Sequence, residues 1–266
     1  PLSENMTPLL INPQLTTDTG SGDTWPPPAV VETQSGLWSA YCQITAYDYA
    51  EPLKTSWFRD VYGNSAAVIT FDDHPTSELI FNRVTQVEYF DHQPLDFVVD
   101  RHAINFPYLL SATERIELEP YLNPSYLNDR IFIRGMGEAT LATGQLVKTY
   151  GLLDQMNRFI ANTFTYRARE EPGVQRLGQT LNIQTGSCRD FTALLIAACR
   201  FFGIPGRFVS GYAITEDIPA ALGATHTWTE VHLPGAGWKG FDNTSGDITG
   251  IKHIAVAGGR DSESLD

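Results

Sequence analysis

The stretch GSCRDFTALLIAACRFFGIP is the feature that most constrains how this chain folds. Ser187 is a good N-cap residue, and Asp190 three positions later is close to the capping box that begins many helices. The Gly-Ile-Pro at the far end supplies helix stop signals. The sequence therefore predicts a helix from about Ser187 to Phe202, with Cys188 in its first turn.

A cysteine in the first turn of a helix is favoured as a nucleophile. The free N–H groups and the positive dipole end at a helix start stabilise the thiolate, which is the reactive form, and Arg189 can add to that field. Cys188 shares a helix face with Phe191 and Leu195, so it points towards whatever the helix packs on. The alternative is that Cys188 is a small buried hydrophobe, as most free cysteines are, and spacing alone leaves both open.

The segment HTWTEVHLPGAGWKGFD supplies a candidate base and a group to orient it. HTWTEVHL alternates as a strand does, PGAG makes a turn, and WKGFD returns as the neighbouring strand. This hairpin places His226 and Asp242 close to opposite register, where their side chains can meet. Taken alone, His226 is an ordinary core or surface histidine, and Trp228 either shields the imidazole or packs in the core. Together, Cys188, His226 and Asp242 make a complete set of nucleophile, base and orienting carboxylate.

The rest of the chain predicts two kinds of structure. Between residues 37 and 99, runs rich in β-forming residues are separated by turn signals about every ten positions, including a Gly-Asn turn, which predicts an all-β, sandwich-like arrangement. Apolar residues at helical spacing predict a further helix within 144–166. Helices followed by antiparallel strands make the second half α+β. We therefore expect a β-sandwich-like domain over residues 1–100 and a catalytic domain over residues 101–266.

Composition argues against several classes of partner. The chain has 18 Lys and Arg residues against 31 Asp and Glu residues and a net charge of −13, so it lacks the clustered basic residues that bind duplex nucleic acid. No stretch approaches the roughly 18 consecutive apolar residues of a membrane-spanning helix, and the first ten residues have no signal-peptide pattern. We expect no nucleic-acid partner, no membrane partner and a cytoplasmic location.

The three cysteines do not form a disulfide framework or a zinc motif. Cys188 and Cys199 would lie roughly 16 Å apart along one helix, too far to be bridged, and Cys42 has no partner nearby in sequence. A free reactive thiol or a reducing compartment fits this usage. The Asp-Asp-His run at 72–74 and the Asp-Arg-His run at 100–102 lack a partner set at metal-ligand spacing, so no metal site is predicted.

Three motifs together resemble the bacterial transglutaminase-like superfamily, which includes proteins identified as cysteine proteases. They are GSCRDFTALLIAACRFFGIPGRFVSGY, HTWTEVHLPGAGWKGFDNT and HIAVAGGRD, and the resemblance runs from about Tyr121 to Asp261. The resemblance implies a papain-like α+β core whose Cys-His-Asp triad corresponds to Cys188, His226 and Asp242. It also implies that the β-rich first hundred residues are the N-terminal domain that accompanies this core.

Two positions depart from the family pattern without removing a triad group. Asn243 replaces the proline that usually follows the aspartate, and Ser262 replaces the tyrosine that usually follows Gly-Arg-Asp. For the oxyanion, the backbone N–H of Cys188 is a candidate donor. Gln184 resembles the position from which papain-like enzymes supply a side-chain donor, and the alternative for it is a loop glutamine in solvent.

The resemblance implies a cysteine-dependent acyl-transfer enzyme acting on peptide-like amides. Hydrolysis of a protein or peptide substrate through a thioester acyl-enzyme is the expected reaction, without a cofactor. Transglutaminase-type transfer to an amine uses the same triad and remains an alternative. So does a non-catalytic binding or scaffold protein on the same fold.

Overall fold

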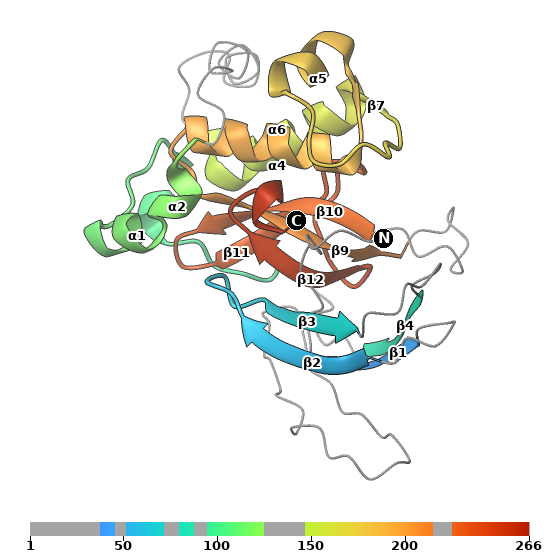
Figure 1. Ribbon diagram of the computed structural model, residues 1–266. Coiled ribbons are helices and arrows are strands. Elements are labelled where there is room, and N and C mark those ends of the chain that lie inside the picture. The colour runs from blue at the N-terminus through green and yellow to red at the C-terminus, as the bar shows by residue number, and fades with distance from the viewer. Residues whose placement is uncertain are drawn as a thin grey trace. The chain divides into compact units, whose positions relative to one another are not determined.

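The computed structural model describes residues 38–45, 52–71, 80–87, 95–124, 147–214 and 225–265 (Figure 1). The chain divides into two compact units, with the boundary between His92 and Gln93. None of the helices in the described ranges is long and apolar enough to cross a membrane.

The first unit contains four strands in two antiparallel pairs. Strand β1 (Trp38–Thr45) pairs with β4 (Ile80–Val87), and β2 (Pro52–Arg59) pairs with β3 (Ser65–Phe71). The β character predicted for this part of the chain is confirmed. The sandwich packing and the domain boundary at residue 100 stay predictions.

The predicted Gly-Asn turn joins β2 to β3. Gly63 has a φ of +82°, in the left-handed region that glycine adopts without strain. The Asp60 carboxylate accepts the backbone N–H of Tyr62 at 2.9 Å and that of Asn64 at 2.8 Å. These local bonds explain why the turn could be located from sequence.

The second unit is built on an antiparallel four-stranded sheet in the order β11-β10-β9-β12. Its strands are β9 (Gly206–Ala213), β10 (Thr225–Leu233), β11 (Gly237–Phe241) and β12 (His253–Gly259). The first three were predicted as β-rich runs, and the second half is α+β as expected. Strand β12 was not predicted as part of the sheet, where it pairs with β9 and not with its chain neighbour.

Two helices cover one side of this sheet, as Figure 1 shows. Helix α6 (Cys188–Phe201) and helix α4 (Thr149–Thr163) agree with the two predicted helices. Shorter elements complete the unit: η1 (Arg101–Ala103), β5 (Asn105–Phe106), α1 (Ala112–Glu117), α2 (Glu119–Leu122), β6 (Val147–Lys148), β7 (Thr165–Tyr166), α5 (Leu177–Ile183), β8 (Thr185–Gly186) and η4 (Ser262–Ser264).

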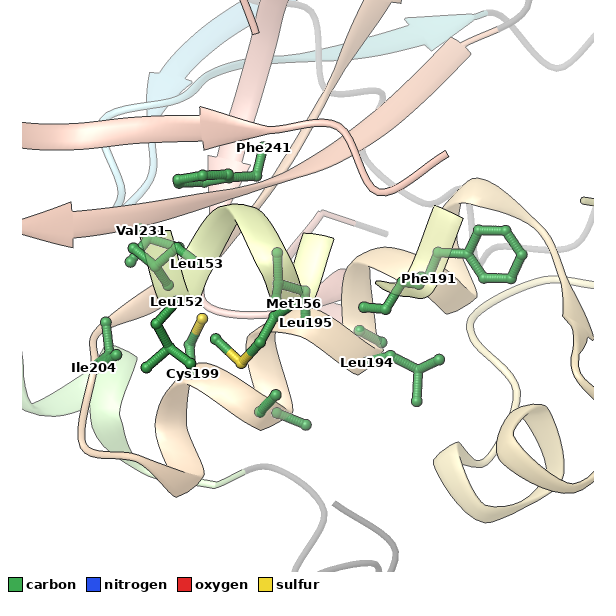
Figure 2. Close-up of a cluster of buried hydrophobic side chains, with 14 of the residues drawn as sticks. Leu152, Leu153, Met156, Phe191, Leu194, Leu195, Cys199, Ile204, Val231 and Phe241 are labelled. Atoms are coloured by element: carbon green, nitrogen blue, oxygen red, sulfur yellow. The ribbon is translucent and has the colours of Figure 1, made fainter. Parts of the chain in front are cut away.

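The core of the second unit lies between α4, α6 and the sheet (Figure 2). Ten of its side chains that are at most 1% exposed are Leu152, Leu153, Met156, Phe191, Leu194, Leu195, Cys199, Ile204, Val231 and Phe241. Burying a large apolar side chain stabilises a fold by about 1.5–3 kcal/mol. Helix α6 is buried on nearly every side, so its first turn is held in a fixed place above the sheet.

Candidate active site

Helix α6 begins where the sequence predicts, because its first turn is capped. Cys188 is the first helical residue and is 8% exposed. The Asp190 carboxylate accepts the backbone N–H of Ser187 at 2.7 Å and its hydroxyl at 2.9 Å, which forms the acidic half of the predicted capping box. The thiol therefore lies at the positive end of the helix dipole.

Asp190 also connects the helix start to a loop, a role that no sequence pattern predicts. Its fully buried carboxylate accepts hydrogen bonds from the Arg169 guanidinium at 2.8 Å and from the backbone N–H of Gln175 at 2.7 Å. Burial raises the pKa of this carboxyl, but bonds from Gln175 and Ser187 and the charge of Arg169 outweigh it, and the pKa lies below its usual value. A buried ion pair thus fastens the segment 169–175 to the helix start.

Arg189 also binds the loop 169–175. Its guanidinium donates to the backbone carbonyls of Arg169 at 3.0 Å and Glu171 at 2.9 Å. From the sequence, Arg189 was expected to add to the electrostatic field at the thiol. The structure shows that its hydrogen bonds go to loop carbonyls.

The β10–β11 hairpin brings His226 and Asp242 together as predicted. The register pairs Thr229 with Phe241, so Asp242 follows the last paired residue and lies diagonally across from His226. The His226 Nε2 and the Asp242 Oδ2 are 3.0 Å apart. The carboxylate is therefore in position to orient the imidazole.

The pKa values of Cys188 and His226 shift in opposite directions from their ordinary values. Burial raises the pKa of the Cys188 thiol, but hydrogen bonding with His226 and Thr227 outweighs it, and the pKa lies below its ordinary value. Burial lowers the pKa of His226, but the bonds to Asp242 and Cys188 raise it to about 9. Both shifts favour the charged forms of the two groups.

Asp242 has a second imidazole partner, His253, which was not predicted as a site residue although it begins the motif HIAVAGGRD. The Asp242 Oδ2 lies 3.0 Å from the Nε2 of each histidine. Its Oδ1 accepts the backbone N–H of Thr244 at 2.9 Å and that of Ser245 at 3.4 Å. Burial raises the pKa of Asp242, but bonds from both imidazoles and from Thr244 hold it well below its usual range. The carboxylate is ionised and fully hydrogen-bonded.

Trp228 fills the space beside both imidazoles. It is 2% exposed, and its ring centroid lies 6.4 Å from that of His226 and 5.4 Å from that of His253. The core alternative is confirmed for Trp228, and the shielding of the imidazole stays a prediction.

Gln184 and Tyr166 lie near the start of α6. Gln184 is exposed at the C-cap of α5 with a left-handed backbone (φ 50°), which favours the solvent alternative for its side chain. Tyr166 was not predicted to matter. It pairs with Gly186 across β7 and β8, and its pKa is raised by burial and then by the charge of Cys188, while Arg189 lowers it. Tyr166 is therefore a further titratable group near the thiol.

The substitution of Asn243 for the family's proline has a structural explanation. Asn243 is fully buried; its amide donates to the Asn157 Oδ1 at 2.8 Å, and its Oδ1 accepts the Thr229 hydroxyl at 2.8 Å. Asn157 in turn donates to the backbone carbonyl of Asp247 at 3.0 Å. These bonds tie the loop that carries Asp242 to α4 and β10.

One group of metal-binding residue types occurs in the described part of the chain. His226, Asp242 and His253 bring ligand atoms within 4.8 Å of one another. Both Nε2 atoms already bond to the same carboxylate oxygen, so we interpret the group as a hydrogen-bonded set that positions His226. The run at 72–74 lies outside the described residues, and the run at 100–102 forms no such group.

Residues 140–243 match the family model of the transglutaminase-like superfamily. They form a transglutaminase-like domain. The match contains Cys188, His226 and Asp242 and ends one residue after the carboxylate, so the segment with His253 lies beyond it.

Curated relatives align with part of this transglutaminase-like domain. An uncharacterised protein of Mycobacterium tuberculosis is 32% identical over 111 residues, which cover 38% of this chain and 35% of the relative. An uncharacterised protein of Mycobacterium leprae is 36% identical over 81 residues, covering 29% of this chain and 28% of the relative. The chain therefore spans about a third of the length of the curated relatives it matches.

A solved structure extends the likeness to most of the chain. The crystal structure of a candidate cysteine protease from Cytophaga hutchinsonii matches with a TM-score of 0.58 at 20% identity, covering 89% of this chain and 75% of that one. At this identity the likeness shows a shared mixed α+β fold alone.

Proposed function

We propose that the transglutaminase-like domain hydrolyses peptide-like amides through a thioester formed on Cys188. The observation that carries this proposal is the 3.0 Å bond between His226 and Asp242 beside a helix-start thiol of lowered pKa. A structural cysteine needs neither partner. The family match and the fold shared with a candidate cysteine protease support the same assignment.

The proposed first half-reaction forms the acyl-enzyme. The Cys188 thiolate attacks the carbonyl carbon, and the carbonyl π electrons move to oxygen. The backbone N–H of Cys188 is the proposed donor to this oxyanion, because the first amides of a helix lack intrahelical carbonyl partners. As the intermediate collapses, the C–N bond breaks and the leaving nitrogen takes a proton from His226, which leaves a thioester.

The second half-reaction returns the enzyme to its starting state. Neutral His226 takes a proton from water, whose oxygen attacks the thioester carbon. The C–S bond then breaks, which releases the carboxylic acid and restores the thiolate and the imidazolium. Nε2 of His226 is held by Asp242, so Nδ1 is the nitrogen that carries the proton in both steps.

The experiment that tests this proposal is turnover of a peptide and amide library, read by mass spectrometry. We expect hydrolysis with a transient mass increase on Cys188 equal to the acyl group, and no hydrolysis by Cys188→Ala. The matched control is Cys199→Ala, which removes the other cysteine of α6. Hydrolysis by folded Cys188→Ala would contradict the proposal.

Repeating the library experiment with an added primary amine shows whether water or the amine accepts the acyl group. We expect the carboxylic acid as the main product. A predominant amide product would replace hydrolysis with transglutaminase-type transfer on the same triad. A cytoplasmic location also belongs to this proposal.

A further inference from the structure

His253 lies next to the proposed triad but outside the family match. It is the first residue of β12, the edge strand that pairs with β9. Its side chain is 11% exposed, and its ring packs edge-on against Trp228, with ring centroids 5.4 Å apart and an interplanar angle of 75°. Packing against Trp228 therefore restricts the position of this ring independently of its hydrogen bonds.

Both nitrogens of His253 have partners. Nδ1 accepts the backbone N–H of Gly250 at 3.3 Å, and Nε2 lies 3.0 Å from the Asp242 Oδ2. A nitrogen that accepts a hydrogen bond carries no proton, so the neutral ring bears its proton on Nε2 and donates it to Asp242. The turn at Gly250 thus selects the tautomer that His253 presents to the carboxylate.

We propose that His253 is a positioning residue that fixes the Asp242 carboxylate, and through it His226, in the orientation that activates Cys188. This inference rests on the proposed function of these three residues. Backbone amides hold the Oδ1 of Asp242, and the two imidazoles share its Oδ2. Without His253, the oxygen that orients His226 loses one of its two N–H donors. In metal sites, loss of a partner that orients a ligand typically costs about 10–100-fold in affinity or activity.

The ionisable groups around the thiol come from five elements of the fold. His226 approaches from β10, Asp242 from the end of β11, His253 from β12, Tyr166 from β7 and Arg189 from α6. Of these groups, His253 contacts the carboxylate and not the thiol. Its effect on Cys188 must therefore pass through Asp242 and His226.

Two substitutions separate the hydrogen bonds of His253. His253→Gln places an amide N–H as many bonds from the backbone as Nε2, so it keeps the donor to Asp242 and loses the acceptor for Gly250. His253→Asn places an amide oxygen at the distance of Nδ1, so it keeps the acceptor and loses the donor. His253→Phe keeps the ring against Trp228 and removes both bonds.

The readouts are the pH dependence of Cys188 alkylation by iodoacetamide and the separate kcat and KM for a hydrolysed amide. For the Asn and Phe variants we expect the midpoint pH of Cys188 alkylation to rise by about one unit. At pH values below the midpoint, this shift lowers the alkylation rate about tenfold. We expect kcat to fall by about 10–100-fold with KM little changed. The Gln variant should keep most of both rates. Circular dichroism checks folding, and the Phe variant decides the matter if the smaller Asn variant is unfolded.

Three results would contradict this inference. If folded Asn and Phe variants match the unchanged protein, His253 does not position Asp242. If Asn retains the rates and Gln loses them, the bond to Gly250 is what matters and the role is structural. If Cys188 of the unchanged protein reacts like a model thiol, the proposed function fails, and this inference fails with it.

Discussion

Cys188 and Cys199 lie on the same buried helix, α6, and their surroundings make them chemically opposite. Cys199 is fully buried among apolar side chains, and this burial raises the pKa of its thiol to about 12. Cys188 is also buried, but the bonds with His226 and Thr227 reverse the effect of burial on its pKa. The comparison teaches that burial alone raises the pKa of a cysteine, and that polar partners at a helix start can outweigh burial and lower it.

The largest effect is expected when each cysteine of the pair is removed in turn. For Cys188→Ala we predict a loss of kcat on the order of 10⁶, the size seen when a triad nucleophile is removed. Cys199→Ala deletes only a buried sulfur from the core, so it should keep its turnover per folded molecule. Amide turnover, normalised to the folded fraction by circular dichroism, measures both. Equal losses of kcat in the two variants would contradict a catalytic role for Cys188 that Cys199 lacks.

The next largest effect is expected from a change in Asp242, whose carboxylate contributes to the difference in pKa between Cys188 and Cys199. In Asp242→Asn an amide replaces the group that raises the pKa of His226 to about 9. We predict a loss in kcat of about 10⁴-fold, as for the equivalent change in a serine protease triad, because the amide favours the wrong imidazole tautomer. We also predict slower alkylation of Cys188 at acidic pH. Unchanged alkylation in the folded variant would show that Asp242 does not act on the thiol.

A stability effect is expected from the ion pair that holds the helix start. Asp190→Ala leaves the Arg169 guanidinium without its buried carboxylate, and breaking a buried pair from one side costs about 3–5 kcal/mol. The matched control is Glu171→Ala, which removes an exposed partner 3.6 Å from the same guanidinium and should cost about 0–1 kcal/mol. Urea unfolding measures both free energies. A similar cost for the two changes would show that Asp190 does not fasten the loop to α6.

The smallest effect concerns the loop that carries Asp242. Asn243→Ala leaves the Oδ1 of the buried Asn157 without its donor and removes one of the two acceptors of the buried Thr229 hydroxyl, which should lower the free energy of unfolding by about 1–3 kcal/mol. The exposed neighbour Ser245 serves as control, and Ser245→Ala should stay within about 0.5 kcal/mol of the unchanged protein. If Asn243→Ala has no greater effect than the control, the buried amide chain is not what holds the loop.

The parts of the site that could be predicted from sequence are those coded by neighbouring residues. The start of α6 follows from Ser187 and Asp190 within one turn, and the approach of His226 to Asp242 follows from a hairpin with a short loop. Both depend on contacts between residues close in the chain. A periodic pattern with turn signals at its ends is sufficient to reveal them.

The parts that sequence did not reveal depend on pairings between distant segments. His253 reaches Asp242 because β12 crosses to pair with β9, placing His253 opposite Ala213. Arg169 reaches Asp190 because an irregular loop folds back over the helix start. No local pattern records either contact, because strand order and loop paths are decided by packing of the whole domain. Asn243 was noticed only as a departure, and its role needed the buried partners to be seen.

The most direct test of the central claim is the rate of Cys188 alkylation by iodoacetamide as a function of pH. The pKa of the Cys188 thiol lies below its ordinary value. The thiolate is therefore present at pH values above this lowered pKa and is lost only as the pH falls through it. We predict fast labelling of Cys188 at mildly acidic pH, where a model thiol with a pKa of about 8.5 is protonated, and loss of this advantage in His226→Ala. A midpoint at or above that of the model thiol, or one unchanged in folded His226→Ala, would contradict the account.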